Sequence, residues 1–216
     1  MQDFAARRTM MVDTQVRPND VTKFPIIEAM LSVPREAFVP AGMTEAAYVG
    51  ENLDLGAGRW LLEPRTFAKM LDALNVQPSD LVLDIAGGLG YSSAVIARMA
   101  EAVVLLETED FATQAEAILS AHGVDNAAVI TGDLPSGAAK HGPYDAIIVE
   151  GGIEVLPPAI LDQLKEGGRI VALFTSGALG TVRMGRKEDG HVAWRDLFNA
   201  AAPALRGFTT ERVFAL

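Results

Sequence analysis

An apolar segment that runs straight into a glycine-rich turn constrains the fold of this chain more than any other feature. It reads Leu81-Val-Leu-Asp-Ile-Ala-Gly-Gly-Leu-Gly-Tyr and continues into the small residues Ser92-Ser-Ala-Val-Ile-Ala. This order predicts a strand, a tight turn and the start of a helix, which is where open α/β sheets bind nucleotide-like cofactors. Glycines at positions 87, 88 and 90 keep side chains away from a ligand and permit positive φ angles.

An acidic residue ends the next apolar segment, at a sequence separation typical of nucleoside-binding sites. The run Ala102-Val-Val-Leu-Leu ends at Glu107, which is 23 residues after Asp84. A carboxylate at the end of that second strand can accept hydrogen bonds from both hydroxyls of a ribose. The glycine turn and Glu107 together therefore predict a site for a nucleoside cofactor.

Two cofactor classes suit such a site, and the residues favour one of them. Dinucleotide sites use a G-x-G-x-x-G turn, but here Gly88-Leu-Gly90 is followed by Ser93 where the third glycine is expected. Asp84 would also repel a pyrophosphate, whereas it would attract the ammonium of an amino acid such as the methionine part of S-adenosylmethionine. We therefore favour a methyl donor over a dinucleotide, with a purely structural glycine turn as the remaining alternative.

Composition limits the class of protein and its partners. A length of 216 residues suits a single domain spanning 1–216, and no apolar run approaches the 18 residues of a membrane span. The chain has no cysteine and three scattered histidines, so we expect no metal site and a reducing cytoplasmic location. The net charge of −10 argues against a nucleic-acid partner. We expect no membrane partner either.

Strand-like and helix-like segments alternate from about residue 66 onward, which predicts an α/β fold with a mostly parallel sheet. The expected strands are Leu81–Ile85, Ala102–Leu106, Ala127–Thr131, Asp145–Val149 and Arg169–Phe174, and the expected helices are Thr66–Leu74, Ser92–Ala100, Phe111–Ala121 and Pro158–Leu164. Further strand candidates at Gly180–Lys187, His191–Leu197 and Thr209–Phe214 predict an antiparallel edge. Residues 1–65 form an N-terminal helical and substrate-loop segment in this scheme, and residues 66–216 form the cofactor-binding core.

Several strings along nearly the whole chain resemble the protein-L-isoaspartate O-methyltransferases. They are Met11-Val-Asp-Thr-Gln-Val-Arg, Glu28-Ala-Met-Leu-Ser-Val-Pro-Arg-Glu-Ala-Phe-Val-Pro, Ala47-Tyr, Asp84-Ile-Ala-Gly-Gly-Leu-Gly-Tyr, Gly132-Asp, Pro143-Tyr-Asp-Ala-Ile-Ile-Val and Leu161-Asp-Gln-Leu-Lys-Glu-Gly-Gly-Arg. The Val-Pro-Arg-Glu-x-Phe-Val-Pro and Gln-Leu-Lys-x-Gly-Gly-Arg strings are close to family-specific. The glycine turn alone would indicate only the wider class of methyltransferases.

The resemblance implies a Rossmann-like class I S-adenosylmethionine-dependent methyltransferase fold. Its sheet would be seven-stranded and mostly parallel with an antiparallel edge, under an N-terminal helical segment. The implied reaction is methylation of the α-carboxyl group of isoaspartyl residues in damaged proteins, a repair activity. The implied partner is thus a protein or peptide with such a residue, although a small carboxylate acceptor of unknown identity is an alternative.

The resemblance also assigns the donor site residue by residue. Asp84, Gly88 and Gly90 match the positions at the methionine and ribose end, and Glu107 matches the residue that binds the ribose hydroxyls. Asp133 matches the residue that meets the adenine amino group, although Gly-Asp is also ordinary turn chemistry.

Two further positions complete the predicted site. Ala86 stands where the family has the first glycine of the turn. Glu150 begins a Glu-Gly-Gly stretch that ends a predicted strand, where the ligand crevice of such a sheet lies. A plain strand-to-helix turn explains that stretch equally well.

The catalytic loop departs from the family pattern of Gly-x-Gly-Gln-Thr-Ile-Ser-x-Pro. Here the aligned stretch is Gly56-Ala-Gly-Arg-Trp-Leu-Leu-Glu-Pro, so Leu62 replaces the serine whose hydroxyl lies close to the substrate carboxylate. Arg59 replaces the glutamine, and we hypothesise that its guanidinium takes over part of acceptor binding. The alternative is that Arg59 pairs with Glu63 or another surface carboxylate.

Three hypotheses about function remain open at this point. The first is an active carboxyl methyltransferase on isoaspartyl or related acceptors. The second is a relative that binds S-adenosylmethionine but has a changed acceptor. The third is a silent binding or regulatory module. The loss of the serine at Leu62 favours the last two, whereas Asp84, Glu107 and Asp133 favour the first two because a silent module needs no donor pocket.

Overall fold

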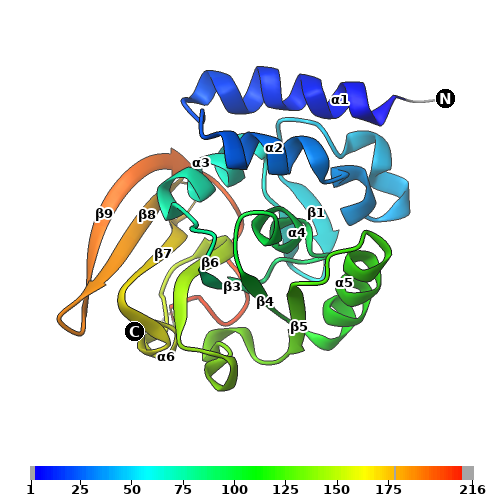
Figure 1. Cartoon of the computed structure of the whole chain (residues 1–216). Helices are drawn as coiled ribbons and strands as arrows, with labels where there is room; N and C mark the ends of the chain where they lie inside the picture. The colour runs from blue at the N-terminus through cyan, green and yellow to red at the C-terminus, as the bar shows by residue number, and fades with distance from the viewer. Residues whose placement is uncertain (1–2, 178, 211–216) are drawn as a thin grey trace, which may run out of the picture.

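A seven-stranded sheet with two layers of covering segments forms the centre of the molecule (Figure 1). The computed structural model describes residues 3–177 and 179–210. The strands are β1 (Leu53–Gly56), β2 (Arg59–Leu61), β3 (Leu81–Ile85), β4 (Ala102–Glu107), β5 (Ala127–Thr131), β6 (Tyr144–Ile153), β7 (Leu164–Ser176), β8 (Leu179–Glu188) and β9 (His191–Ala200). The α-helices are α1 (Phe4–Met11), α2 (Phe24–Ser32), α3 (Pro64–Leu74), α4 (Tyr91–Ala97), α5 (Glu109–Ala121) and α6 (Pro158–Asp162). Short π and 3₁₀ segments span Val12–Val16, Arg17–Asn19, Arg35–Phe38, Ala41–Ala46, Leu134–Ser136 and Ala139–His141.

The strand order confirms the predicted fold class. The large sheet runs β5-β4-β3-β6-β7-β8-β9, in which β3 to β7 pair in parallel and β8 and β9 pair antiparallel at one edge. The five parallel strands and the first two edge strands lie where the sequence predicts them. Of the third edge candidate, Thr209 and Thr210 are described and belong to no strand, and the other four residues lie outside the described part of the chain.

Alternate residues of the central strands enter two separate cores, because successive side chains of a strand point to opposite faces. Val82 and Val103 pack in one core with the N-terminal segments and with α3, α4 and α5. Leu83 and Val104 pack in the other core with α6 and the chain beyond β9. The strands are therefore covered on both faces, which explains their nearly unbroken apolar sequence.

A hairpin stands where the sequence predicts a substrate loop. β1 and β2 pair antiparallel through a tight turn in which Ala57 and Gly58 both have positive φ angles, 47° and 74°. Turns of this kind match the twist of the two strands that they join. The hairpin packs its apolar side chains inward and contacts β6, so it lies against the end of the sheet that carries the predicted site.

The chain beyond β9 covers the end of β6. The Gly152 N–H donates to the Pro203 carbonyl at 3.0 Å, and the Leu205 N–H donates to the Gly152 carbonyl at 2.7 Å. Leu205 and Phe208 are fully buried. The Glu-Gly-Gly stretch at 150–152, for which the sequence left a ligand crevice and a plain turn as alternatives, belongs to β6 and is enclosed by protein.

One buried arginine ties the N-terminal segment to the core. The Arg35 Nε donates to the Ala47 carbonyl and its Nη2 to the Leu62 carbonyl, both at 2.7 Å. Its guanidinium carbon lies 4.8 Å from the centre of the Tyr91 ring, at the start of α4. Burial lowers the pKa of Arg35, and the neighbouring tyrosine opposes the shift. A planar fork is needed to reach both carbonyls at once.

We therefore expect Arg35→Lys to lower the free energy of unfolding by about 2–4 kcal/mol, since an ammonium cannot make both charge-assisted hydrogen bonds in this geometry. Denaturant titration measures the change. The exposed Arg195→Lys provides the control and should stay within about 0.5 kcal/mol of the parent. Equal stability of the two variants would contradict the proposed anchoring.

Candidate functional site

The glycine turn after β3 has the backbone that a ligand site at a helix start requires. Ala86, Gly88 and Gly90 have φ angles of 65°, 59° and 93°, and α4 begins at the next residue. Ala86 adopts this left-handed conformation despite its Cβ, at a cost of roughly 1–2 kcal/mol. A Cβ at Gly87 would lie 2.7 Å from both the Asp84 carboxylate and a serine hydroxyl, so glycine is required there for packing.

Asp84 is fully buried at the end of β3. Its Oδ2 accepts hydrogen bonds from the Ser92 and Ser93 hydroxyls, each at 2.6 Å. Its Oδ1 has no hydrogen-bond partner among the described residues. Burial raises the pKa of Asp84 to about 6, although the two hydroxyl hydrogen bonds oppose the shift.

Glu150 brings a second carboxylate to the same buried region. It lies in β6, beside β3, and its Oε1 also lacks a hydrogen-bond partner within the described part of the chain. Burial raises the pKa of Glu150 well above its usual range; the charge of Asp84 adds to this shift and that of Arg35 opposes it. Two neighbouring acids with unsatisfied oxygens form a place where a small cation would be stabilised.

Glu107 is also fully buried, but its hydrogen bonds are complete. The Arg59 Nε donates to Oε1 at 2.8 Å and to Oε2 at 3.0 Å. The Gly88 N–H donates to Oε1 at 2.9 Å, and the Thr108 N–H donates to Oε2 at 2.8 Å. The carboxylate that the sequence assigns to a ribose is thus bound to the protein's own groups.

Within the described part of the chain, Arg59 pairs with the buried Glu107 and not with Glu63 or another surface carboxylate, which was the alternative interpretation of the sequence. Its side chain is only 5% exposed and forms an ion pair with Glu107. Its guanidinium carbon lies 5.7 Å from the centre of the Phe111 ring. The hypothesis that Arg59 assists acceptor binding is not tested by this arrangement.

Asp133 lies apart from the buried acids, beside a cavity of about 530 Å³. It is exposed, and its Oδ2 accepts a hydrogen bond from the Ser136 hydroxyl at 2.6 Å. Arg59 and Arg206 line the same cavity. Its position after β5 suits contact with a base, while its hydrogen bond is also the turn chemistry that the sequence allowed.

Leu62 lies in the core rather than on a reactive surface. Its side chain is fully buried, and its carbonyl accepts the Arg35 hydrogen bond described above. A leucine in this position neither donates to nor accepts from an acceptor carboxylate. The residue aligned with the family serine is therefore a packing residue in this structure.

The arrangement fits the implied methyl donor at two of three places. The unpartnered oxygens of Asp84 and Glu150 suit its cationic amino-acid end, and the cavity beside Asp133 suits its base. At the ribose position, Arg59 engages Glu107, and the Leu55 methyl carbon would lie 2.6 Å from a Cβ built on Gly88. The hairpin therefore covers the middle of the predicted site.

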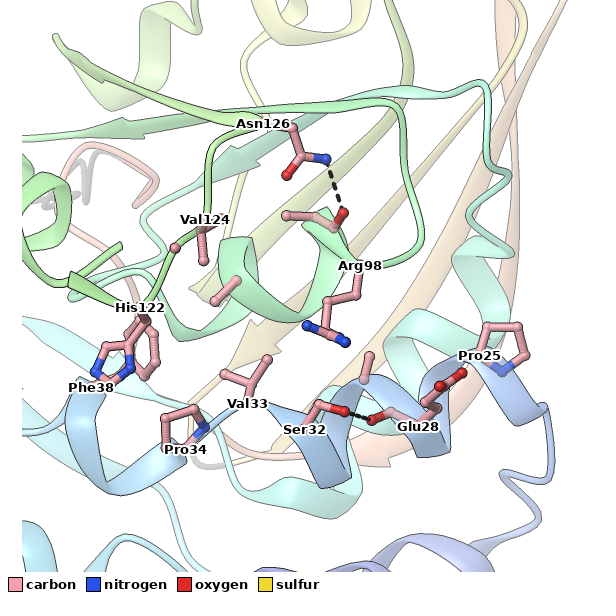
Figure 2. A pocket seen from close by; sticks show the side chains of 14 residues that line it. Pro25, Glu28, Ser32, Val33, Pro34, Phe38, Arg98, His122, Val124 and Asn126 are labelled. Atoms are coloured by element: carbon pink, nitrogen blue, oxygen red, sulfur yellow. Dashed lines mark hydrogen bonds between the residues drawn. The ribbon is translucent and has the colours of Figure 1, made fainter. Parts of the chain in front are cut away.

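A second pocket, of about 600 Å³, lies between α2, α4 and the end of α5. Figure 2 shows Glu28, Ser32, Arg98, His122 and Asn126 around it. None of the predicted site residues lines it, so the sequence-based prediction and this pocket point to different parts of the molecule.

Metal-binding groups and membrane-spanning helices were also considered from the sequence. Within residues 3–177 and 179–210, no group of three or more histidine, cysteine, aspartate or glutamate side chains is placed to hold a metal ion. In the same part of the chain no helix has the length and apolar character needed to cross a membrane.

Sequence reasoning did not assign Leu55, Arg35 or the segment after β9 to this region. Arg35 sits in the family-specific Val-Pro-Arg-Glu string, and a charged residue in that apolar context was a usable signal. Leu55 and Leu205 carry no such signal, because an aliphatic residue in a short segment does not indicate which cavity it fills.

Comparison with known proteins gives a consistent result. The family model for protein-L-isoaspartate(D-aspartate) O-methyltransferase (PCMT) matches residues 7–201. A protein-L-isoaspartate O-methyltransferase from Koribacter versatilis is 35% identical over 190 residues, covering 88% of this chain and 86% of that protein. One from Methylorubrum extorquens is 35% identical and covers 96% of this chain and 92% of its own length.

A solved structure supports the fold. A Plasmodium falciparum protein named for the same methyltransferase, crystallised with S-adenosyl-L-homocysteine, superposes with a TM-score of 0.78. The match covers 95% of this chain and 99% of that one at 18% identity. The predicted family resemblance and fold class are confirmed by these comparisons.

We expect Leu62→Ser to lower the free energy of unfolding by about 3–5 kcal/mol, because it leaves a cavity and buries a hydroxyl. For a chain of this length the melting temperature should fall by roughly 2–4 °C for each kcal/mol. The matched control is Leu179→Ser at a leucine that is 79% exposed, where little change is expected. An unchanged melting temperature for Leu62→Ser would contradict its placement in the core.

A second prediction concerns pH. An acid with a pKa of about 6 when folded and about 3.9 when unfolded binds its proton more tightly in the folded state. Its contribution to stability is therefore complete below pH ~4 and is lost as the pH rises to about 6. We expect the free energy of unfolding of wild type, relative to Asp84→Asn, to fall between pH 4 and pH 7. The exposed Asp162→Asn should show no such trend, and a pH-independent difference for Asp84→Asn would refute the assignment.

Proposed function

This chain belongs to the protein-L-isoaspartate(D-aspartate) O-methyltransferase family, and we propose that it transfers a methyl group from S-adenosylmethionine to the α-carboxyl group of isoaspartyl residues in proteins. The observation that carries the donor part of the proposal is the buried pair of carboxylates at the glycine turn. Asp84 and Glu150 each keep one unpartnered oxygen in a region that excludes water. A cationic ligand beside the pair would give both oxygens a partner and would favour their charged forms.

The donor would be held by residues from four neighbouring strands. Asp84 and Glu150, in β3 and β6, would face its charged amino-acid end. Glu107, at the end of β4, would accept from the ribose hydroxyls, and Asp133, after β5, would meet the base. The positive φ angles at Gly88 and Gly90 let the backbone approach the ligand closely.

The reaction makes modest chemical demands on the protein. S-adenosylmethionine supplies a methyl group on a sulfonium, which is already activated toward a carboxylate oxygen. An ionised carboxylate is itself the nucleophile, so no side chain has to remove a proton. The protein's task is to hold the acceptor oxygen in line and to exclude water, and positioning of this kind is worth up to ~7–11 kcal/mol.

The acceptor side rests on fewer residues. Leu62 cannot hydrogen-bond to a carboxylate, so the acceptor needs another donor of hydrogen bonds. Arg59 forms an ion pair with the predicted ribose carboxylate, and a guanidinium can bind a carboxylate through two parallel hydrogen bonds. We extend the proposal to the repair of damaged proteins and to a cytoplasmic location; both derive from the family resemblance and the sequence.

The burial of Leu62 supports a second candidate function. The position of the family serine is a core leucine, which removes a polar contact expected at the acceptor. This favours a methyltransferase with a changed acceptor, or a member without methyl transfer. Donor binding would be retained in the first case.

Transfer of a radiolabelled methyl group distinguishes these functions. We expect label to enter an isoaspartyl peptide and not the matched peptide with a normal aspartate. Glu107→Gln should reduce donor affinity by about tenfold or more, because it removes charge-assisted hydrogen bonds to the ribose. Glu109→Gln, at an exposed acid two residues away, should not.

Calorimetry with S-adenosyl-L-homocysteine completes this test. Donor binding without label in either peptide would select the changed acceptor. If neither heat of binding nor label is observed with folded protein, the proposed methyltransferase function is wrong.

A further inference from the structure

The carboxylate assigned to the ribose already has a full set of hydrogen bonds. A carboxylate offers about four lone-pair positions, and Glu107 receives four contacts of 2.8–3.0 Å from Arg59, Gly88 and Thr108. Two of these come from backbone N–H groups of the turn and of the strand end, which cannot leave without disrupting both. The Arg59 contacts are therefore the ones that a ligand can replace.

The hairpin closes the same place sterically. Leu55, in β1, fills the space over the α-carbon of Gly88, where a Cβ would come within 2.6 Å of its methyl carbon. Arg59 begins β2, so both side chains belong to one hairpin. The tip of this hairpin, residues 56–58, is exposed and makes no contribution to either core. A movement of the hairpin would withdraw Leu55 and Arg59 together.

We propose that Arg59 competes with the donor's ribose for Glu107, and that donor binding releases Arg59 to bind the acceptor carboxylate. The inference rests on the proposed function and deepens it, because it names the residue that couples the two substrates. Arg59 thus acts as a positioning residue whose partner changes during the reaction cycle. The acceptor would bind after the donor.

The fate of the released arginine supports this coupling. Its side chain is 5% exposed, and a buried cation without a partner is strongly unfavourable. Once the ribose occupies Glu107, Arg59 requires another anion, because Glu107 is its ion-pair partner among the described residues. An acceptor carboxylate supplies the anion that Glu107 no longer provides.

Among the described residues the other buried arginine is Arg35, and its contacts show why the argument does not apply to it. Arg35 donates to two backbone carbonyls and so has a fixed structural role. The hydrogen bonds of Arg59 go to one side chain, Glu107, which the donor itself would bind, and its other contact is with the Phe111 ring. The exchange needs no additional protein group.

Calorimetric titration with S-adenosyl-L-homocysteine tests the competition directly. We expect Arg59→Gln to bind this ligand about tenfold or more tightly than wild type, since it no longer has to displace an ion pair. Leu55→Ala, which clears the space over Gly88, should also bind more tightly. It provides the independent variant if Arg59→Gln fails to fold. Arg195→Gln, at an exposed arginine, is the control and should match wild type.

The coupling between substrates gives a second readout. Isoaspartyl peptide should bind wild type more tightly when S-adenosyl-L-homocysteine is present, because coupling between two ligands is reciprocal. This difference should vanish in Arg59→Gln, which lacks the residue that couples the two sites. Equal or weaker binding of the nucleoside by Arg59→Gln and by Leu55→Ala would overturn the inference. Wild-type protein that shows the predicted binding changes but labels no peptide would instead overturn the proposed reaction and leave the competition for Glu107 intact.

Discussion

The buried carboxylate of Glu107 is the contact on which the arrangement of the site depends. It joins three parts of the chain that are far apart in sequence: the glycine turn through the Gly88 N–H, the start of α5 through the Thr108 N–H, and the hairpin through Arg59. A buried charge in this position is tolerated only because each of its oxygens is hydrogen-bonded. The same completeness makes it a poor ligand for anything else until one partner leaves.

Much of the fold was predictable because strand and helix periodicity carry it. The parallel strands are apolar on both faces, and the glycines after β3 indicate a turn, so the sequence predicts the positions of both. The hairpin and the segment after β9 were not. β2 has only three residues, and Leu205 and Phe208 follow strand β9 in a segment without regular structure. Such segments are positioned by tertiary contacts rather than by local pattern.

The site divides in the same way. Asp84 and Glu107 lie near the ends of neighbouring parallel strands, as this topology requires, whereas Glu150 lies within β6, which continues to Ile153. The partner of Arg59 could not be expected from the topology. An ion pair between residues 48 positions apart depends on how the hairpin folds back, whereas a sequence-based argument looks to near neighbours such as Glu63. Burial also alters the chemistry, because it leaves Asp84 and Glu150 with unsatisfied oxygens that no spacing reveals.

Two of the departures from the family pattern, at Arg59 and Leu62, are best understood together. Leu62 removes a neutral hydroxyl from the acceptor side, and Arg59 adds a cation three residues earlier in the chain. A neutral hydroxyl in an empty site costs little free energy. A buried guanidinium without a counter-ion costs much more, so it needs an anionic partner when no acceptor is bound. Glu107 is that anion in this structure. In the proposed exchange, an arginine-based contact in place of the serine would make Glu107 part of acceptor binding as well as donor binding. Donor affinity would then have to be high enough to displace the Arg59–Glu107 ion pair before an acceptor could bind.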